Sequence, residues 1–108
     1  MPDDEKPGGF GSLPGDLFDG LINYFDLTPP LSAPLEPFRK QILVELAKTE
    51  HAAANAEKAP YAVDVVFKCL SIQSEFLSAR DANLPDPVRA QAMTNIVNTL
   101  TALRGLWV

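Results

Sequence analysis

Apolar residues recur three and four positions apart along most of this chain, the spacing that places side chains on one face of an α-helix. The clearest stretches predict a short N-terminal helix over about 12–27 and three longer helices over about 34–58, 60–82 and 86–104. No stretch shows the alternation and hairpin turns of a β-sheet. We therefore expect an all-α fold, a small up-down bundle of three core helices, with the short helix packed on it or on a partner.

Proline and glycine mark the boundaries of these helices. Pro60 separates the second helix from the third, and Gly105 follows the last apolar position of the fourth. Asp86 and Pro87 predict the start of the fourth helix, since Asp suits the N-cap and Pro the first helical position. The short connections around Pro60 and before Asp86 predict that consecutive core helices are antiparallel neighbours.

The third predicted helix is apolar on two sides. Its two rows are Val65, Cys69, Ile72 and Phe76, and Val63, Val66, Phe67, Leu70 and Leu77. A helix that is apolar nearly all round is typical of a bundle's centre, so we expect this helix to be the buried central one. Truncating Leu70 to alanine should then cost about 2–5 kcal/mol of stability.

Composition and charge narrow the classes of function. Apolar residues make up 46% of the 108 residues, enough for a single packed domain over 12–108. The net charge of −5 argues against binding to nucleic acid, and no uncharged apolar stretch is long enough for membrane insertion. Residues 1–11 are rich in acids, Pro and Gly, which predicts a flexible leader rather than a secretory signal. With a single cysteine, these features predict a cytoplasmic protein.

Residues that could perform chemistry are few. His51 has no carboxylate one helical turn away to orient its ring and no second histidine to share a metal. Cys69 stands among apolar residues, where a thiol is inert. The sequence therefore predicts no catalytic residue, no metal or cofactor site and no small-molecule substrate, and we do not expect an enzyme.

The first helix carries an aromatic and aliphatic face that needs a surface to lie on, because so short a helix is marginal alone. This face could complete the protein's own bundle, or it could dock into a groove of a partner. The sequence leaves both possibilities open. The residues of this candidate interface are Leu17, Phe18, Leu21, Ile22 and Phe25.

The outer face of the fourth helix is polar but uncharged. Solvated helix faces usually carry Lys and Glu, which form helices better than Asn and Thr. Depletion of charge is a feature of interface centres, so this face is a second candidate interface, with plain polar surface as the alternative. Its residues are Thr94, Asn95, Asn98 and Thr101, with Trp107 just beyond the helix.

Three hypotheses of function follow, and all involve another protein or other copies of this chain. The first is a small accessory or adaptor protein that acts through protein–protein contacts. The second is a self-assembling structural subunit. The third is a small acidic inhibitor of a basic protein surface, since residues 1–26 carry six acids and one base, whereas residues 87–108 carry two arginines and no acid.

Overall fold

The computed structural model describes residues 13–26, 31–57 and 60–107, and these ranges form four α-helices and one short 3₁₀ helix, without a strand. The predicted all-α bundle is confirmed. The leader predicted over residues 1–11 lies outside the described residues. In chain order the helices are α1 (Leu13–Phe25), η1 (Ala33–Leu35), α2 (Glu36–Asn55), α3 (Ala62–Ala79) and α4 (Asp86–Arg104).

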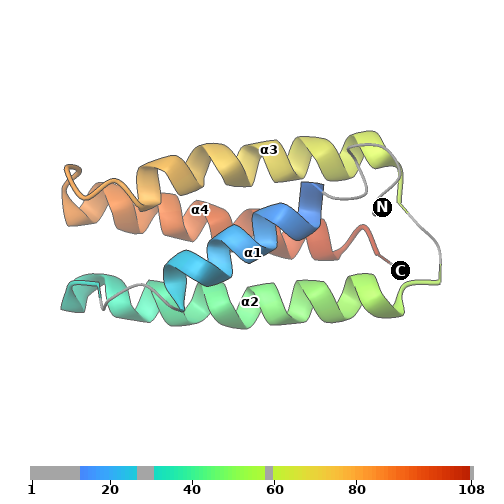
Figure 1. The fold of residues 1–108 in the computed structure, drawn as a ribbon, viewed down its shortest axis with the longest axis horizontal. Coiled ribbons are helices and arrows are strands. Elements are labelled where there is room, and N and C mark those ends of the chain that lie inside the picture. The colour runs from blue at the N-terminus through green and yellow to red at the C-terminus, as the bar shows by residue number, and fades with distance from the viewer. Residues whose placement is uncertain (1–12, 27–30, 58–59, 108) are drawn as a thin grey trace, which may run out of the picture.

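The three long helices lie along the length of the molecule, and α1 crosses them diagonally (Figure 1). α2 and α4 point in the same direction and α3 runs opposite to both. α4 packs against both α2 and α3, whereas α2 and α3 make no close backbone approach to each other in the described ranges. The expectation that the second and third helices are neighbours is therefore wrong. α1 packs on α2 and on α3, and so bridges the gap between them.

Prolines stand where the helices can accommodate them. Pro37 and Pro87 lie in the first turns of α2 and α4, where backbone N–H groups have no intrahelical partner to lose. The helix predicted to begin near residue 34 is preceded instead by the separate turn η1, which contains Pro34. Gly105 ends α4 as predicted, in the ordinary right-handed conformation with φ of −66°.

Asp86 does not cap α4. Pro85 occupies the N-cap position, and Asp86 is the first residue of the helix. Its carboxylate accepts a hydrogen bond from the hydroxyl of Ser32, with 3.0 Å between Oγ and Oδ2. The predicted N-cap role of Asp86 is therefore wrong. Its side chain instead joins the start of α4 to the segment that precedes η1. Its charge still suits the positive end of the α4 dipole.

α4, and not α3, is the central helix. Its buried side chains face α2 and α3, which both pack against it, and its Arg89 reaches Tyr24 of α1. α3 has neighbours on one side only, so it buries one of its two apolar rows and leaves most of the other in solvent. The buried residues of α4 are Arg89, Ala92, Met93, Ile96, Val97, Leu100 and Leu103.

α1 closes the bundle of its own chain. Leu17, Phe18, Leu21 and Phe25 are all buried there. A Cβ atom at Gly20 would lie 3.9 Å from the Phe76 ring, an ordinary contact distance, so the packing of α1 on α3 leaves room for a methyl group there. The tyrosine and phenylalanine rings around the end of α1 meet edge to face or tilted, at centroid distances of 5.0–5.7 Å.

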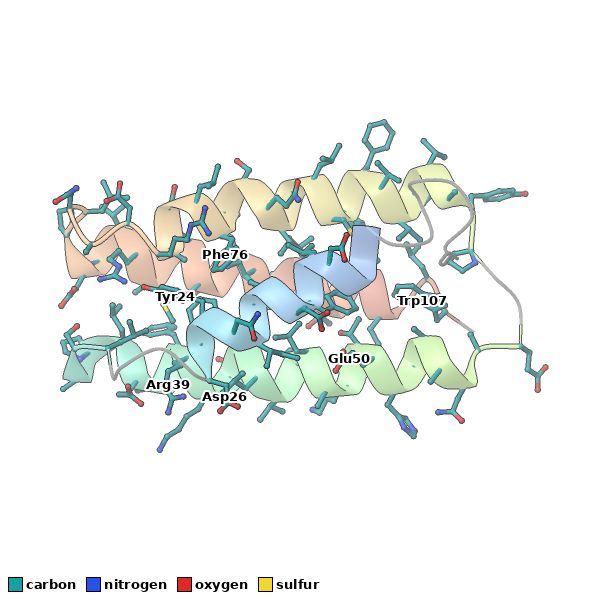
Figure 2. The ribbon with its side chains drawn as sticks, viewed as in Figure 1. Tyr24, Asp26, Arg39, Glu50, Phe76 and Trp107 are labelled. Atoms are coloured by element: carbon teal, nitrogen blue, oxygen red, sulfur yellow. The ribbon has the colours of Figure 1, made fainter. Side chains whose placement is uncertain are left out.

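Two arginines satisfy the carbonyl groups at helix ends. Arg39 of α2 donates to the carbonyl oxygen of Phe25 at the end of α1, at 2.8 Å. Arg89 is buried and donates from Nε to the carbonyl oxygen of Ala79 at the end of α3, at 2.9 Å, and from Nη2 to the hydroxyl of Tyr24, at 3.0 Å. Figure 2 shows Tyr24 lying beside the Phe76 end of α3. Cations at these places suit the negative ends of the helix dipoles.

A polar cluster fastens α2 to α4. Glu45 is 9% exposed, and its carboxylate accepts hydrogen bonds from Arg104, at 2.5 Å, and from Thr101, at 3.3 Å. Lys48 lies 3.7 Å from its other oxygen. The hydrogen bond from Arg104 holds the pKa of the Glu45 carboxyl below its ordinary value, although burial works in the opposite direction. One turn further, the buried Thr49 hydroxyl donates to the carbonyl oxygen of Glu45, at 2.7 Å.

Candidate interaction surface

Groups that could perform chemistry do not converge in the described part of the chain. Across residues 13–26, 31–57 and 60–107, no three His, Cys, Asp or Glu side chains gather as metal ligands would. Cys69 is buried, and desolvation raises the pKa of its thiol to about 11, which keeps it in the poorly reactive protonated form. His51 is exposed beside Asn55. The candidate site is instead an exposed face of one helix.

The most distinctive surface is the outer face of α3, defined here as Val63, Phe67, Leu70, Ser74 and Leu77. These residues follow one another at alternating spacings of four and three, so they form a straight stripe along the helix. The exposed fractions are 55% for Val63, 66% for Phe67, 48% for Leu70 and 60% for Leu77. Figure 2 shows side chains projecting from this edge of α3 away from the other helices.

No charged residue lies on this stripe. The nearest charged positions of α3 lie about 100–140° around the helix from its centre, at the 100° advance of each residue. The positions closer to the stripe are Val66, Ser71, Gln73 and Ser78, which are apolar or uncharged. An exposed helix face normally carries charge, so the outer face of α3 has the composition of an interface centre. The flanking charged residues are Asp64, Lys68, Glu75 and Arg80.

The size of the exposed apolar area supports the same interpretation. At ~160–210 Å² of accessible surface for each full residue, the four fractions amount to roughly 400 Å². A contiguous apolar patch of this size is at the level where patches on monomers are often functional. Grooves border both ends of the stripe. One lies between α1 and α3 beside Leu77, and the other between α3 and α4 beside Phe67.

The candidate interface on the first helix lies mostly inside the protein. Of the residues predicted from the aromatic face, Leu17, Phe18, Leu21 and Phe25 are buried in the core and Ile22 is half-buried. Of the two possibilities that the sequence leaves open, the structure has α1 completing its own bundle. The aromatic face of α1 is therefore occupied in this conformation.

The candidate interface on the fourth helix lies at the surface. Asn98 and Thr101 are exposed, Thr94 and Asn95 are half-buried, and Trp107 is half-buried at the end of the bundle (Figure 2). Several of these side chains bond within the protein. Asn95 donates to the Glu75 carboxylate of α3, at 3.2 Å, and Thr101 donates to Glu45 of α2. Whether this face contacts a partner stays a prediction.

Sequence reasoning recorded the four apolar residues of the α3 stripe but assigned them to the core. The signal that could have separated the two rows is the position of the charges. Around the helix, Lys68 and Glu75 lie nearer to the row of Cys69 and Ile72 than to the Val63–Leu77 row, so charge did not mark the Val63–Leu77 row as the exposed one. Only the arrangement of the neighbouring helices decides which row is buried.

Comparison with protein-family models, with curated proteins and with solved structures finds no match to this chain. Within the described ranges, no helix has both the length and the apolar character needed to cross a membrane.

Proposed function

We propose that this protein is a small non-catalytic accessory or adaptor protein that acts through protein–protein contacts, and that the outer face of α3 is its docking surface. The observation that carries the proposal is a stripe of five residues along α3, apolar except for one serine, exposed and free of charge. Leaving Phe67 and its neighbours in water gives up the stabilisation that their burial would provide. A contact that covers the stripe would recover it. A cytoplasmic location stays part of this proposal.

The acidic-inhibitor alternative keeps one observation in its favour. Asp16 and Asp19 of α1 and Asp26, which directly follows it, are all exposed opposite the buried face of this helix. Binding through these carboxylates would weaken as salt is raised, because exposed charge pairs are screened. Binding through the outer face of α3 would persist in salt, which separates the two functions.

The test compares three tagged proteins in affinity capture from the cells that produce the chain. The variant Phe67→Asp places a charge on the outer face of α3. The control Val44→Asp places the same charge on an isolated apolar residue of α2, which is 51% exposed. Both changes carry the same cost of aspartate in a helix, within about 1 kcal/mol.

We expect wild type and Val44→Asp to capture the same proteins, untagged copies of the chain included, and Phe67→Asp to lose them. Thermal melts of all three should show one cooperative transition. If the three proteins capture identical sets, the outer face of α3 is not the docking surface and the proposed function fails.

A further inference from the structure

We infer that the outer face of α3 is covered by the same face of a second copy of this chain, in an antiparallel α3–α3 pair related by a twofold axis near Leu70. This inference rests on the proposed function and names its partner. Antiparallel pairing is the arrangement that a twofold axis perpendicular to a helix imposes, and twofold dimers are the commonest protein oligomers.

The spacing of the stripe matches this symmetry. Counted from Leu70, Val63 and Leu77 lie seven residues away on opposite sides, and Phe67 and Ser74 lie three and four residues away. An antiparallel pair centred on Leu70 therefore sets Val63 against Leu77 of the second copy and Leu70 against itself.

The remaining positions of the stripe are complementary in size. In the same register, Phe67 lies at the level of Gln73 of the second copy, and Ser74, which is on the stripe, lies one residue or about 1.5 Å further along the axis. Phe67 has the largest side chain of the stripe and Ser74 the smallest, so the ring of one copy fits over the gap that the serine leaves in the other. Large residues facing small ones allow helix surfaces to interdigitate.

Electrostatics permits the pair to form without burying charge. The outer face of α3 contains no ionisable group, so neither copy has to desolvate one. Asp64, Lys68 and Glu75 stand on one flank, where they would form a polar rim. The net charge of −5 on each copy opposes association over longer distances, and salt would screen this repulsion.

The area is sufficient for a weak but specific dimer. A standard interface removes about 800 Å² from each partner, of which rather more than half is apolar. The stripe supplies roughly 400 Å² of apolar surface from its exposed fractions, and the flanking residues of α3 can supply the polar remainder. We expect a dissociation constant on the order of 10 µM, at the weak end for interfaces of this area.

The chain's own N-terminal segment is a poor alternative occupant. Residues 1–12 contain Met1 and Phe10 as their only large apolar side chains. Four large apolar residues are exposed on the stripe. A second copy offers four matching residues at matching positions, which the segment cannot.

The experiment is sedimentation velocity of the purified full chain, from about 5 to about 500 µM, which brackets the affinity expected for this area. We expect wild type to pass from monomer to dimer over this range, and the dimer to become tighter when salt is raised. Two variants should remain monomeric at the highest concentration. They are Phe67→Asp and Ser74→Arg, which places a charge where the phenyl ring of the second copy would sit. Val44→Asp should dimerise as wild type does.

Cysteine cross-linking tests the register. Under mild oxidation Leu70→Cys should form a disulfide-linked dimer by itself, because the twofold axis sets residue 70 against its own copy within about 7 Å between Cα atoms. Val63→Cys should cross-link when mixed with Leu77→Cys and not when alone. Wild type serves as the control, since its one thiol, Cys69, is buried.

The failures of the two proposals are distinguishable. A wild type that stays monomeric throughout, while Phe67→Asp still loses captured proteins, overturns the second copy as occupant and leaves the proposed function standing. A monomeric wild type whose captured proteins do not depend on Phe67 overturns both. A dimer that survives Phe67→Asp and Ser74→Arg also overturns the inference, because it must use another surface.

Discussion

At the scale of single residues, buried polar side chains decide how α2 meets α4. Glu45 and Thr49 lie on the face of α2 that is otherwise packed with Ile42 and Leu46. The carboxylate is retained because Arg104 and Thr101 of α4 both donate to it. A buried charge with such partners is costly to leave unpaired, so the cluster fixes which residues of the two helices face each other.

Glu45→Gln should lower the free energy of unfolding at pH 7 by about 1–2 kcal/mol, because it removes a charged acceptor from Arg104. The folded-state pKa of this carboxyl is depressed below 4.5, so its contribution is present above pH 4.5 and disappears as pH falls through the folded pKa. The difference between variant and wild type should therefore shrink between pH 5 and about pH 3. Urea titrations at both ends of this range would measure it.

Glu50→Gln is the matched control, since Glu50 is an exposed carboxylate on the same helix. It should change stability by less than about 0.5 kcal/mol. An equal loss for Glu45→Gln at neutral and acid pH would show that the charge of Glu45 is not the source of its contribution.

Leu70→Ala should cost under about 1 kcal/mol, and not the ~2–5 kcal/mol expected from the sequence, because the side chain is 48% exposed and leaves no closed cavity. Leu100→Ala should cost about 2–5 kcal/mol, because Leu100 is fully buried on the central helix. Urea unfolding of both variants at low protein concentration, where any dimer has dissociated, makes the comparison. Equal losses would place the outer face of α3 inside the monomer.

At the scale of helices, the positions of the elements follow from the sequence more directly than their neighbours do. α4 was predicted over 86–104 and observed as Asp86–Arg104, because Pro87 and Gly105 mark its ends. α3 was predicted to be central because two of its rows are apolar. Hydrophobic periodicity identifies faces that avoid water but does not say what covers them. A row destined for a partner and a row destined for the core therefore look the same in one sequence.

Spacing alone also could not say what covers the aromatic face of α1. This face is buried within the chain, whereas the second apolar row of α3 is mostly exposed. The aromatic face of α1 suited a partner groove as well as the protein's own core, and the structure buries Phe18 and Phe25 within the chain. α2 and α3 stand on either side of α4 and leave one face of it open. Which apolar face fills that gap depends on the tertiary arrangement of three helices, which local spacing does not contain.

Gly20→Ala should stabilise the protein by about 0.5–1 kcal/mol, since alanine forms helix better than glycine at an interior position. The new methyl group would meet Phe76 at 3.9 Å, an ordinary contact distance. Gly15→Ala, also within α1 but with nothing near its Cβ position, is the control for propensity alone. Thermal melts that show Gly20→Ala to be destabilising would mean that α1 must approach α3 more closely than in this structure.

At the scale of the whole molecule, two uncharged surfaces distinguish the protein from an ordinary acidic bundle. One is the outer face of α3, which is apolar, and the other is the outer face of α4, which is polar. Exposed apolar area provides a driving force for association, whereas amide and hydroxyl groups are already satisfied by water. We therefore expect the outer face of α3 to provide the contact, although both faces lack charge.

Asn98→Lys tests this choice of surface. Asn98 is exposed in the middle of the uncharged face of α4, and lysine forms helix better than asparagine, so stability should stay within about 0.5 kcal/mol of wild type. An ammonium group buried in an interface without a partner would cost several kcal/mol, which is enough to abolish a micromolar complex. If the outer face of α3 is the contact, sedimentation and capture should be unchanged in Asn98→Lys and lost in Phe67→Asp. The reverse result, with both variants melting normally, would move the interface to α4.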